Sequence, residues 1–187
     1  MAETAQKKRR DAPRTKARIL AAAQQIFAEV GYSQAGIRDI AAMAEVDSAL
    51  VPRYFGSKAG LFEAALIDAI PRYSEIDLKQ EGFGARLTAQ FLDTFLDLRA
   101  QAMMVLSTSD PDARTISARV MEEYGIKPLA QWLGPPDART RAVRMTMLST
   151  SFMLYTRQIP LMSPDAAIDS ETSEWLAQSL QAIIDQR

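Results

Sequence analysis

Residues 37–58 constrain the fold of this chain most strongly, because two short helices joined by a tight turn can be read from them. An apolar stripe at the spacing of one helical face precedes the turn and comprises Ile37, Ile40, Ala41 and Ala44. Asp47 can cap the second helix by accepting hydrogen bonds from N–H groups near Ala49. A helix this short is unstable alone and must pack against its neighbour. This pattern is typical of a helix-turn-helix.

A further helix is predicted directly after this pair. Gly56 readily adopts a left-handed helix stop, and Ser57 can cap the helix that follows. Lys58 then places a positive charge at the positive end of that helix dipole, which is unfavourable unless an anion lies nearby. A phosphate group of DNA would meet this need.

Cysteine and histidine are both absent from the 187 residues. Without cysteine there is no disulfide framework, thiolate nucleophile or zinc-thiolate site, and without histidine the commonest general base and transition-metal ligand are missing. We therefore expect no enzyme, no metal site and no cofactor. The remaining enzyme hypothesis is a helical protein that uses a carboxylate pair such as Asp110 and Asp112.

The net charge of −1 conceals an asymmetry between the two parts of the chain. Up to residue 60 there are ten Lys and Arg against six acids, and after it twelve against seventeen. Only the first part is therefore suited to approach a polyanion. We see neither a secretory signal nor an apolar run of membrane-spanning length, so we expect a cytoplasmic protein that has no membrane partner.

Several motifs resemble the N-terminal domain of tetracycline-repressor (TetR) type regulators. In order, they are Arg18 to Ala23, Phe27, Glu29, Gly31-Tyr32, Ile37 to Ala41, Tyr54 to Lys58 and Leu61-Phe62. The resemblance covers residues 14–67. It implies an all-helical homodimer that places a recognition helix of each subunit in the major groove of a palindromic operator. It also implies a C-terminal domain that binds a small molecule and then releases the DNA.

We accordingly expect an all-α chain of about nine helices, in which a three-helix helix-turn-helix domain is joined by a linking helix to a C-terminal helical domain. The expected divisions are a basic flexible arm at 1–12, the DNA-binding domain at 13–73 and an effector-binding and dimerisation domain at 74–187. A merely solubilising tail is the alternative for the arm. Helices are expected at 14–30, 37–44, 48–55, 58–73, 85–108, 111–123, 126–133, 137–159 and 164–186.

Proline and an acid open three helices of the C-terminal part, in the runs Asp110-Pro111-Asp112, Pro135-Pro136-Asp137 and Ser163-Pro164-Asp165. Pro71 disturbs the end of the helix over 58–73 and marks a candidate hinge. The last two helices both carry apolar faces. They either close the core of a monomer or, as the resemblance implies, form a four-helix dimer interface with a second copy.

Side-chain chemistry and the resemblance together select a set of DNA-binding candidates. They are Arg9, Arg10, Arg14, Gly36, Arg38, Asp47, Ser48, Ala49, Leu50, Pro52, Arg53, Tyr54 and Lys58. In the recognition helix, Arg53 offers the donor pair that suits guanine, although phosphate binding is its alternative. Arg38 and Lys58 correspond to backbone-contacting positions of the family, with a plain surface charge as the alternative.

The chain departs from the family pattern at three places. Ala35-Gly36 lacks the usual hydroxyl cap before the first helix of the pair, which puts a phosphate contact there in doubt. Glu45 replaces the usual glycine of the turn, where a left-handed residue is strained. Pro52 lies inside the recognition helix and is expected to kink or tighten it.

Soft and aromatic side chains of the C-terminal domain are candidates for an effector site. They are Met103, Met104, Met121, Trp132, Met147, Phe152 and Tyr155. Ordinary core packing is the alternative for each of them, and Glu122-Glu123 is interpreted as a solvated face. We expect an apolar, largely uncharged effector. A regulator of the same fold that binds another protein, or no effector, is the second hypothesis.

Overall fold

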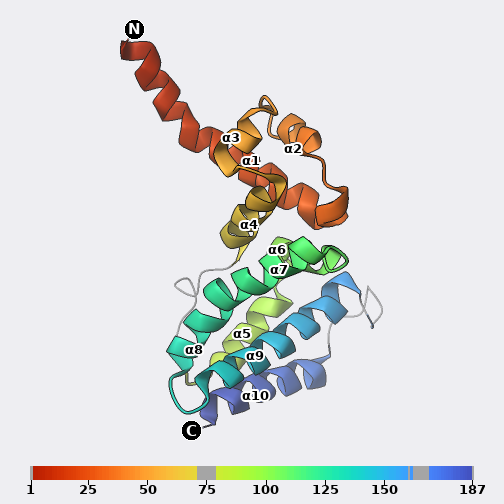
Figure 1. The fold of residues 1–187 in the computed structure, drawn as a ribbon. Coiled ribbons are helices and arrows are strands. Elements are labelled where there is room, and N and C mark those ends of the chain that lie inside the picture. Colours follow the sequence, from red (N-terminus) through yellow and green to blue (C-terminus); the bar gives the residue numbers. More distant parts are fainter. Residues whose placement is uncertain (1, 71–78, 160, 162–168, 187) are drawn as a thin grey trace. The chain divides into compact units, whose positions relative to one another are not determined.

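The protein is described by a computed structural model over residues 2–70, 79–159, 161 and 169–186, and for residues 2–11 by the backbone alone. Throughout these ranges the chain forms helices and turns without a strand, which confirms the expected all-α fold (Figure 1). None of these helices is long and apolar enough to cross a membrane. The chain forms two compact units, Met1–Ile70 with Leu98–Val120 and Pro71–Asp97 with Met121–Arg187. Leu98–Val120 was expected in the second domain and instead groups with the first unit.

The first helix is longer than expected. We expected a flexible arm up to residue 12 and a helix over 14–30, but α1 (Ala2–Gln34) includes both, with Pro13 inside it. The arm consists largely of Ala, Gln, Lys and Arg, which favour a helix, and this explains the difference. Gly31 interrupts the helix with a φ of 72° rather than ending it. A Cβ at Gly31 would lie 2.5 Å from the carbonyl oxygen of Leu106, so a glycine is needed for this close approach.

The first unit packs six helices around one core. α2 (Ile37–Met43), α4 (Lys58–Ala69) and α6 (Arg99–Leu106) lie against α1. α3 (Leu50–Phe55) and α7 (Pro111–Val120) pack against α4. Phe62 is fully buried at the centre, and its ring contacts those of Phe27 and Tyr32 at centroid distances of 5.0 and 5.2 Å. α4 ends at Ala69, and the predicted hinge residue Pro71 lies outside the described residues.

The single helix expected over 85–108 is wrong. The structure has α5 (Phe83–Leu92) and α6, separated by a turn at residues 93–97. Asp93 ends α5 in an extended conformation, and its carboxylate accepts a hydrogen bond of 2.9 Å from the N–H of Phe95. An aspartate that bonds to the backbone two residues later favours a turn over a helix. Phe95, expected on an apolar helix face, is 93% exposed.

The second unit contains α5, α8 (Lys127–Leu133), α9 (Ala138–Met153) and α10 (Ser170–Asp185). Figure 1 shows α5, α9 and α10 as neighbouring helices. α5 and α10 approach closely at Gly84, where a Cβ would clash with the carbonyl oxygen of Ala177. Their buried contacts centre on Phe83, Leu176 and Leu180.

Two predicted helices end in π-helical turns. The helix expected over 111–123 divides into α7 and the turn η2 (Met121–Ile126), and that over 137–159 into α9 and η3 (Leu154–Gln158). α10 begins at Ser170, capped by Asp169, and the predicted start at Ser163-Pro164-Asp165 lies outside the described residues.

The two other proline-led helix starts differ in their caps. Pro111 begins α7 as expected, and Asp110 caps it by accepting a hydrogen bond of 3.0 Å from the N–H of Ala113. Asp137, by contrast, adopts a left-handed φ of 50°, and its side chain makes no capping bond within the described part of the chain. Asp137 thus lies at the start of α9 as expected, but it does not cap the helix by a hydrogen bond as Asp110 caps α7.

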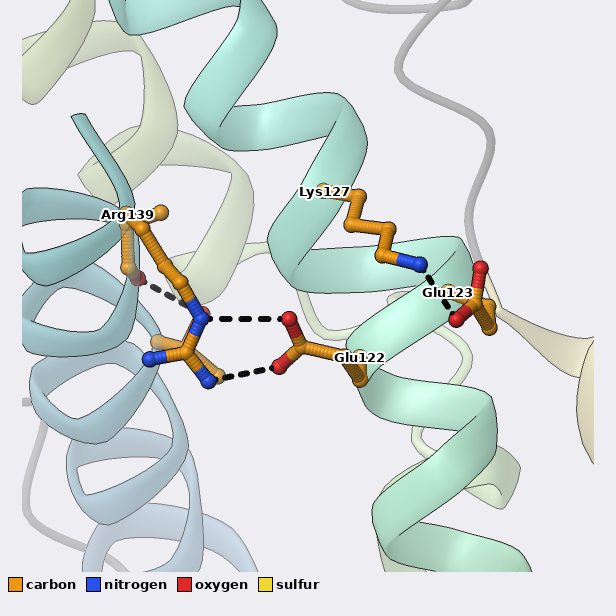
Figure 2. A network of polar contacts seen from close by, with 6 residues as sticks. Glu122, Glu123, Lys127 and Arg139 are labelled. Carbon is orange, nitrogen blue, oxygen red and sulfur yellow. Dashed lines mark hydrogen bonds and ion pairs between the residues drawn. The ribbon is translucent and has the colours of Figure 1, made fainter.

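Polar contacts tie the second unit together. Arg141 is only 2% exposed, and its guanidinium donates to carbonyl oxygens at the ends of α8 and α10. Figure 2 shows that Glu122 accepts two hydrogen bonds from Arg139, at 3.1 and 2.9 Å, while Glu123 turns away to Lys127. This bidentate bond lowers the pKa of Glu122 and raises that of Arg139. The two acids thus point to separate cations, and all four side chains remain partly exposed, which agrees with the expected solvated face.

Candidate nucleic-acid interface

The first helix of the pair begins without a hydroxyl cap. Gly36 precedes α2, and no described side chain caps it, as the Ala35-Gly36 departure predicted. Asp39 lies over this position so closely that a Cβ on Gly36 would clash with its carboxylate. A carboxylate in the first turn interacts favourably with the helix dipole. Gly36 therefore makes room for an acid that partly replaces the missing cap.

The turn between α2 and α3 contains a left-handed glutamate. Glu45 has a φ of 49°, which confirms the strained conformation expected at this position. Arg18 of α1 donates to the Glu45 carbonyl oxygen at 3.2 Å and to its carboxylate at 2.9 Å. One arginine therefore holds both the backbone and the side chain of the turn.

α3 begins two residues later than expected. Asp47 accepts a bond of 2.8 Å from the N–H of Ala49, as its role as a cap predicted, but α3 starts at Leu50 and not at Ser48. Its first turn is tight, because the N–H groups of Leu50 and Val51 bond three residues back, at 2.9 and 3.2 Å. Pro52 therefore falls in the first turn, where its missing N–H costs little. The expected tightening is confirmed, whereas nothing indicates a kink within α3.

The exposed side of α3 presents a short row of side chains. Val51 is fully buried and fixes the helix to the core, while Ser48, Ala49, Pro52 and Arg53 are exposed. Leu50 and Tyr54 are half-buried and pack against the same core. The exposed set therefore combines one guanidinium with small and rigid neighbours.

A tight reversal links α3 to α4. Gly56 has a φ of 77° and a ψ of −55°, and the N–H of Ser57 bonds to the carbonyl oxygen of Phe55 at 2.9 Å. This is a γ-turn and not the left-handed helical stop that we expected. Ser57 caps α4 as predicted, because its hydroxyl accepts a bond of 3.0 Å from the N–H of Gly60.

The remaining basic candidates occupy different surroundings. Arg14 and Arg38 are exposed, and Arg9 and Arg10 belong to the segment of α1 described by its backbone alone. Lys58 is half-buried: its Nζ donates to the carbonyl oxygen of Ser33 at 3.2 Å and lies 4.8 Å from the ring centroid of Tyr32. The structure therefore gives the ammonium of Lys58 partners within the protein itself.

The structure divides the predicted effector residues between the two units. Met103 is fully buried in the first core and Met104 packs against it. In the second unit Phe152 is buried, and its ring centroid lies 6.3 Å from that of Phe91. The ring centroids of Trp132 and Phe83 are 4.5 Å apart, and the side chain of Met121 lies over Gly125. Met147 and Tyr155 are exposed instead. The structure therefore does not bring the seven residues together as one group.

Several polar residues of consequence were not identified from the sequence. Ser107 and Ser33 bond to neighbouring helices, and Thr88 is 4% exposed with a hydroxyl that has no hydrogen-bond partner within the described ranges. Arg141 is buried in a run that contains three arginines, namely Arg139, Arg141 and Arg144. A helical projection of α9 alone could have placed Arg141 on the side of Ala142 and Met145, which are also buried.

Comparison with protein families assigns both halves of the chain. The model for bacterial regulatory proteins of the tetR family matches residues 19–65, and the model for a tetracyclin repressor-like C-terminal domain matches residues 81–184. The chain belongs to the tetR family. It is thus a transcriptional regulator with a DNA-binding helix-turn-helix. TetR-family proteins are regulators rather than enzymes, and they bind DNA and small-molecule ligands, typically as dimers.

Solved structures of TetR-family proteins resemble this chain over most of its length. A regulator from Streptomyces coelicolor A3 is 27% identical, with 93% of this chain and 96% of that chain covered and a TM-score of 0.54. NalD, the secondary repressor of the MexAB-OprM multidrug efflux pump in Pseudomonas aeruginosa, is 20% identical, with 91% and 96% covered and a TM-score of 0.63. FadR from Bacillus subtilis in complex with stearoyl-CoA is 15% identical, with 90% and 97% covered and a TM-score of 0.59. No curated protein sequence gives a significant match.

Proposed function

We infer that this TetR-family protein is a ligand-responsive repressor. Two copies bind a palindromic operator in the bacterial cytoplasm, and a small apolar effector in the C-terminal domain, residues 74–187, releases the DNA. The observation that carries the DNA-binding part is the exposed row on α3, which Val51 fixes to the core. Of this row, Arg53 has the donor pair that reads guanine in the major groove.

Selection of bound sequences from a random double-stranded DNA pool tests this part of the proposal. The wild type should enrich a sequence with two inverted half-sites. Arg53→Ala should lose preference at one base position of each half-site, by about 1 to 3 kcal/mol, while other positions keep theirs. Arg144→Ala is the matched control, since Arg144 is an exposed arginine of α9 in the second unit. If Arg53→Ala weakens every sequence equally, Arg53 binds phosphate and does not read a base.

The basic candidates of α1, α2 and α4 support affinity without sequence preference. Arg9, Arg10, Arg14, Arg38 and Lys58 would neutralise phosphates, so the binding constant should fall steeply as salt rises. Replacing Arg38 by Gln should lower the affinity for all sequences by a similar factor and reduce the salt slope by about one for each of the two bound subunits. An unchanged slope would assign Arg38 to a plain surface role.

Homodimerisation is proposed through the outer face of the last two helices. Met147 is 64% and Trp175 54% exposed, and Tyr155 of η3, which follows α9, is also exposed. Leu176, Leu180 and Ile184 face the core of their own subunit and are therefore not available to a partner. Large exposed apolar side chains of this kind are typical of an interface.

Sedimentation equilibrium tests the dimer. Trp175→Glu should weaken self-association by at least roughly 30-fold, the expected effect of losing a central aromatic residue of an interface. Glu174→Gln, at the adjacent exposed position, should leave it unchanged. A wild-type protein that stays monomeric at micromolar concentration, also with operator present, would contradict the proposed assembly.

The effector proposal rests on the apolar second unit. Phe152, Trp132 and Met121 belong to this unit, and Thr88 adds a buried hydroxyl that has no partner within the described ranges. FadR, a structural neighbour, binds stearoyl-CoA, whose acyl chain is of the apolar kind proposed here. A thermal-shift screen should therefore favour apolar, uncharged compounds over anionic ones of equal size. Hits among anions alone would contradict the proposed chemistry, and hits that leave operator binding intact would contradict the repressor mechanism.

A further inference from the structure

The ammonium of Lys58 is held at the junction of α1 and α4. Its Nζ donates to the carbonyl oxygen of Ser33 at 3.2 Å and lies over the face of the Tyr32 ring, at 4.8 Å from the centroid. Such a contact is a cation–π interaction, which strengthens when the cation is partly desolvated. Since the side chain is half-buried, these two contacts fix its position.

The turn between α6 and α7 fixes the residues that hold Lys58. The N–H of Tyr32 donates to the hydroxyl oxygen of Ser107 at 2.9 Å, and the hydroxyl of Ser33 donates to Asp110 Oδ2 at 3.1 Å. The other carboxylate oxygen of Asp110 caps α7. Asp110 is therefore immobilised by its own helix and by the residue whose carbonyl binds Lys58.

Electrostatics link Asp110 to Lys58. Burial lowers the pKa of Lys58, and the negative charge of Asp110 opposes this effect by favouring the ammonium. The pKa of Asp110 lies below its ordinary value, because the N–H of Ala113 and the hydroxyl of Ser33 bind its carboxylate and Lys58 lies nearby. At neutral pH the pair is therefore a carboxylate and an ammonium.

We propose that Asp110 is a positioning residue that restrains Lys58 and so competes with DNA phosphate for its ammonium. This inference rests on the proposed function of the first unit in binding DNA. An ammonium on a flexible stem can leave the Ser33 carbonyl for a phosphate oxygen, but it then gives up the stabilising charge of Asp110. Asp110 thereby lowers operator affinity and reduces the number of phosphates that the protein neutralises.

Asp110→Asn tests this competition, because asparagine caps a helix as well as aspartate does and removes only the charge. Binding to the selected operator is measured by fluorescence anisotropy between 50 and 300 mM salt. We expect the variant to bind roughly 3- to 10-fold more tightly at the low-salt end and its salt slope to steepen by up to about 1.8, the equivalent of one further phosphate for each of the two bound subunits. Asp110→Ser, another neutral cap, should reproduce both changes.

A double-mutant cycle separates this role from a general charge effect. In a Lys58→Gln background, Asp110→Asn should leave affinity and slope unchanged, since the residue through which it acts is missing. Asp112→Asn is the matched control. It removes an acid from the same helix turn whose side chain makes no hydrogen bond to Ser33 or Lys58 within the described residues, so it should leave the slope unchanged.

Each outcome bears on the proposal. The proposal is overturned if Asp110→Asn and Asp112→Asn change operator affinity equally, or if Asp110→Asn still changes it in the Lys58→Gln background. It is also overturned if both Asp110 variants bind the operator more weakly while their circular dichroism spectra match the wild type. If the wild type selects no DNA sequence at all, the proposed function fails. If the wild type selects an operator but the salt slope of its binding is the same in the Asp110 variants, only this inference is contradicted.

Discussion

Replacing Arg141 by methionine should destabilise the second unit, because the guanidinium joins the ends of two helices. Its Nη1 donates to the carbonyl oxygen of Ile184 at 3.0 Å and its Nη2 to that of Leu133 at 3.2 Å, and both bonds are buried. Further bonds reach Pro136, Ile183 and Gly134. These carbonyls belong to or follow the last turns of α8 and α10, where the negative ends of the helix dipoles favour a cation.

The magnitude follows from the acceptors that would lose their donor. A buried acceptor without a partner costs about 1 to 3 kcal/mol, and two of the five bonds are fully buried. Methionine fills most of the volume of the arginine side chain, so the cavity contribution is small. Its neutral side chain also avoids the free-energy cost of burying the guanidinium charge, which offsets part of the loss. We therefore expect a loss of about 2 to 5 kcal/mol, a large fraction of the stability of a domain. Arg141→Lys keeps the charge but not the planar fork of donors, so it should lose about half as much.

Urea unfolding followed by tryptophan fluorescence measures this loss locally. Trp132 and Trp175 are the only tryptophans of the sequence, and both belong to the second unit. Arg144→Met is the matched control, because this arginine lies one turn further along α9 and is exposed, so its replacement should change stability by less than about 0.5 kcal/mol. Equal unfolding midpoints for Arg141→Met and Arg144→Met would refute the argument.

Three further predictions concern the same unit. Thr88→Val should raise the unfolding free energy by about 1 kcal/mol, because it removes a buried hydroxyl that has no partner in the described ranges. Thr146→Val should not raise it, because the Thr146 hydroxyl bonds to the Ala142 carbonyl at 2.9 Å, and equal changes in both variants would contradict this prediction. Gly84→Ala should cost about 1 to 3 kcal/mol in the same assay, since its Cβ forces α5 away from the Ala177 carbonyl of α10. The N–H and hydroxyl of Thr172 hold the pKa of Asp169 below its ordinary value, so its cap stabilises at neutral pH and is lost as the pH falls through the lowered pKa. The gap in urea midpoint between wild type and Asp169→Ala should therefore close below about pH 4, and a constant gap would contradict this role.

Local rules predicted the helix-turn-helix well, because its signals act over a few residues. The caps by Asp47 and Ser57 and the left-handed Glu45 each depend on bonds to nearby backbone. The start of α3 was misplaced because a tight first turn and a helical turn have similar sequence patterns.

Longer-range features escaped prediction. Residues 85–108 carry a helical apolar pattern, and only the bond from Phe95 to Asp93 shows why the chain turns there. The grouping of α6 and α7 with the first unit follows from the packing of α6 on α1, which is close at Gly31, and of α7 on α4. The burial of Arg141 requires carbonyls at the ends of α8 and α10. The sequence predicted where these helices end, at residues 133 and 186, but not that both ends meet one arginine of α9.

The conformation of Glu45 depends on a local rule and on a long-range contact, and substitutions at this residue separate the two effects. The left-handed φ of 49° was predictable from the position of the residue in the turn, whereas its contact with Arg18 across 27 residues was not. At an ordinary helical site a protein with glycine is about 1 kcal/mol less stable than the same protein with alanine. At a left-handed site the glycine protein is the more stable one, by a similar amount.

Comparison of Glu45→Gly with Glu45→Ala isolates the backbone strain, because both variants lose the carboxylate that Arg18 contacts. We expect the glycine variant to be more stable than the alanine variant by about 1 kcal/mol in thermal unfolding followed by circular dichroism. Ala42→Gly, at an exposed position of the neighbouring helix α2, should instead lose about 1 kcal/mol relative to wild type. If Glu45→Ala proves as stable as Glu45→Gly, the turn relaxes out of the left-handed region once Arg18 is released, and the ion pair, not the fold of the turn, imposes the strain.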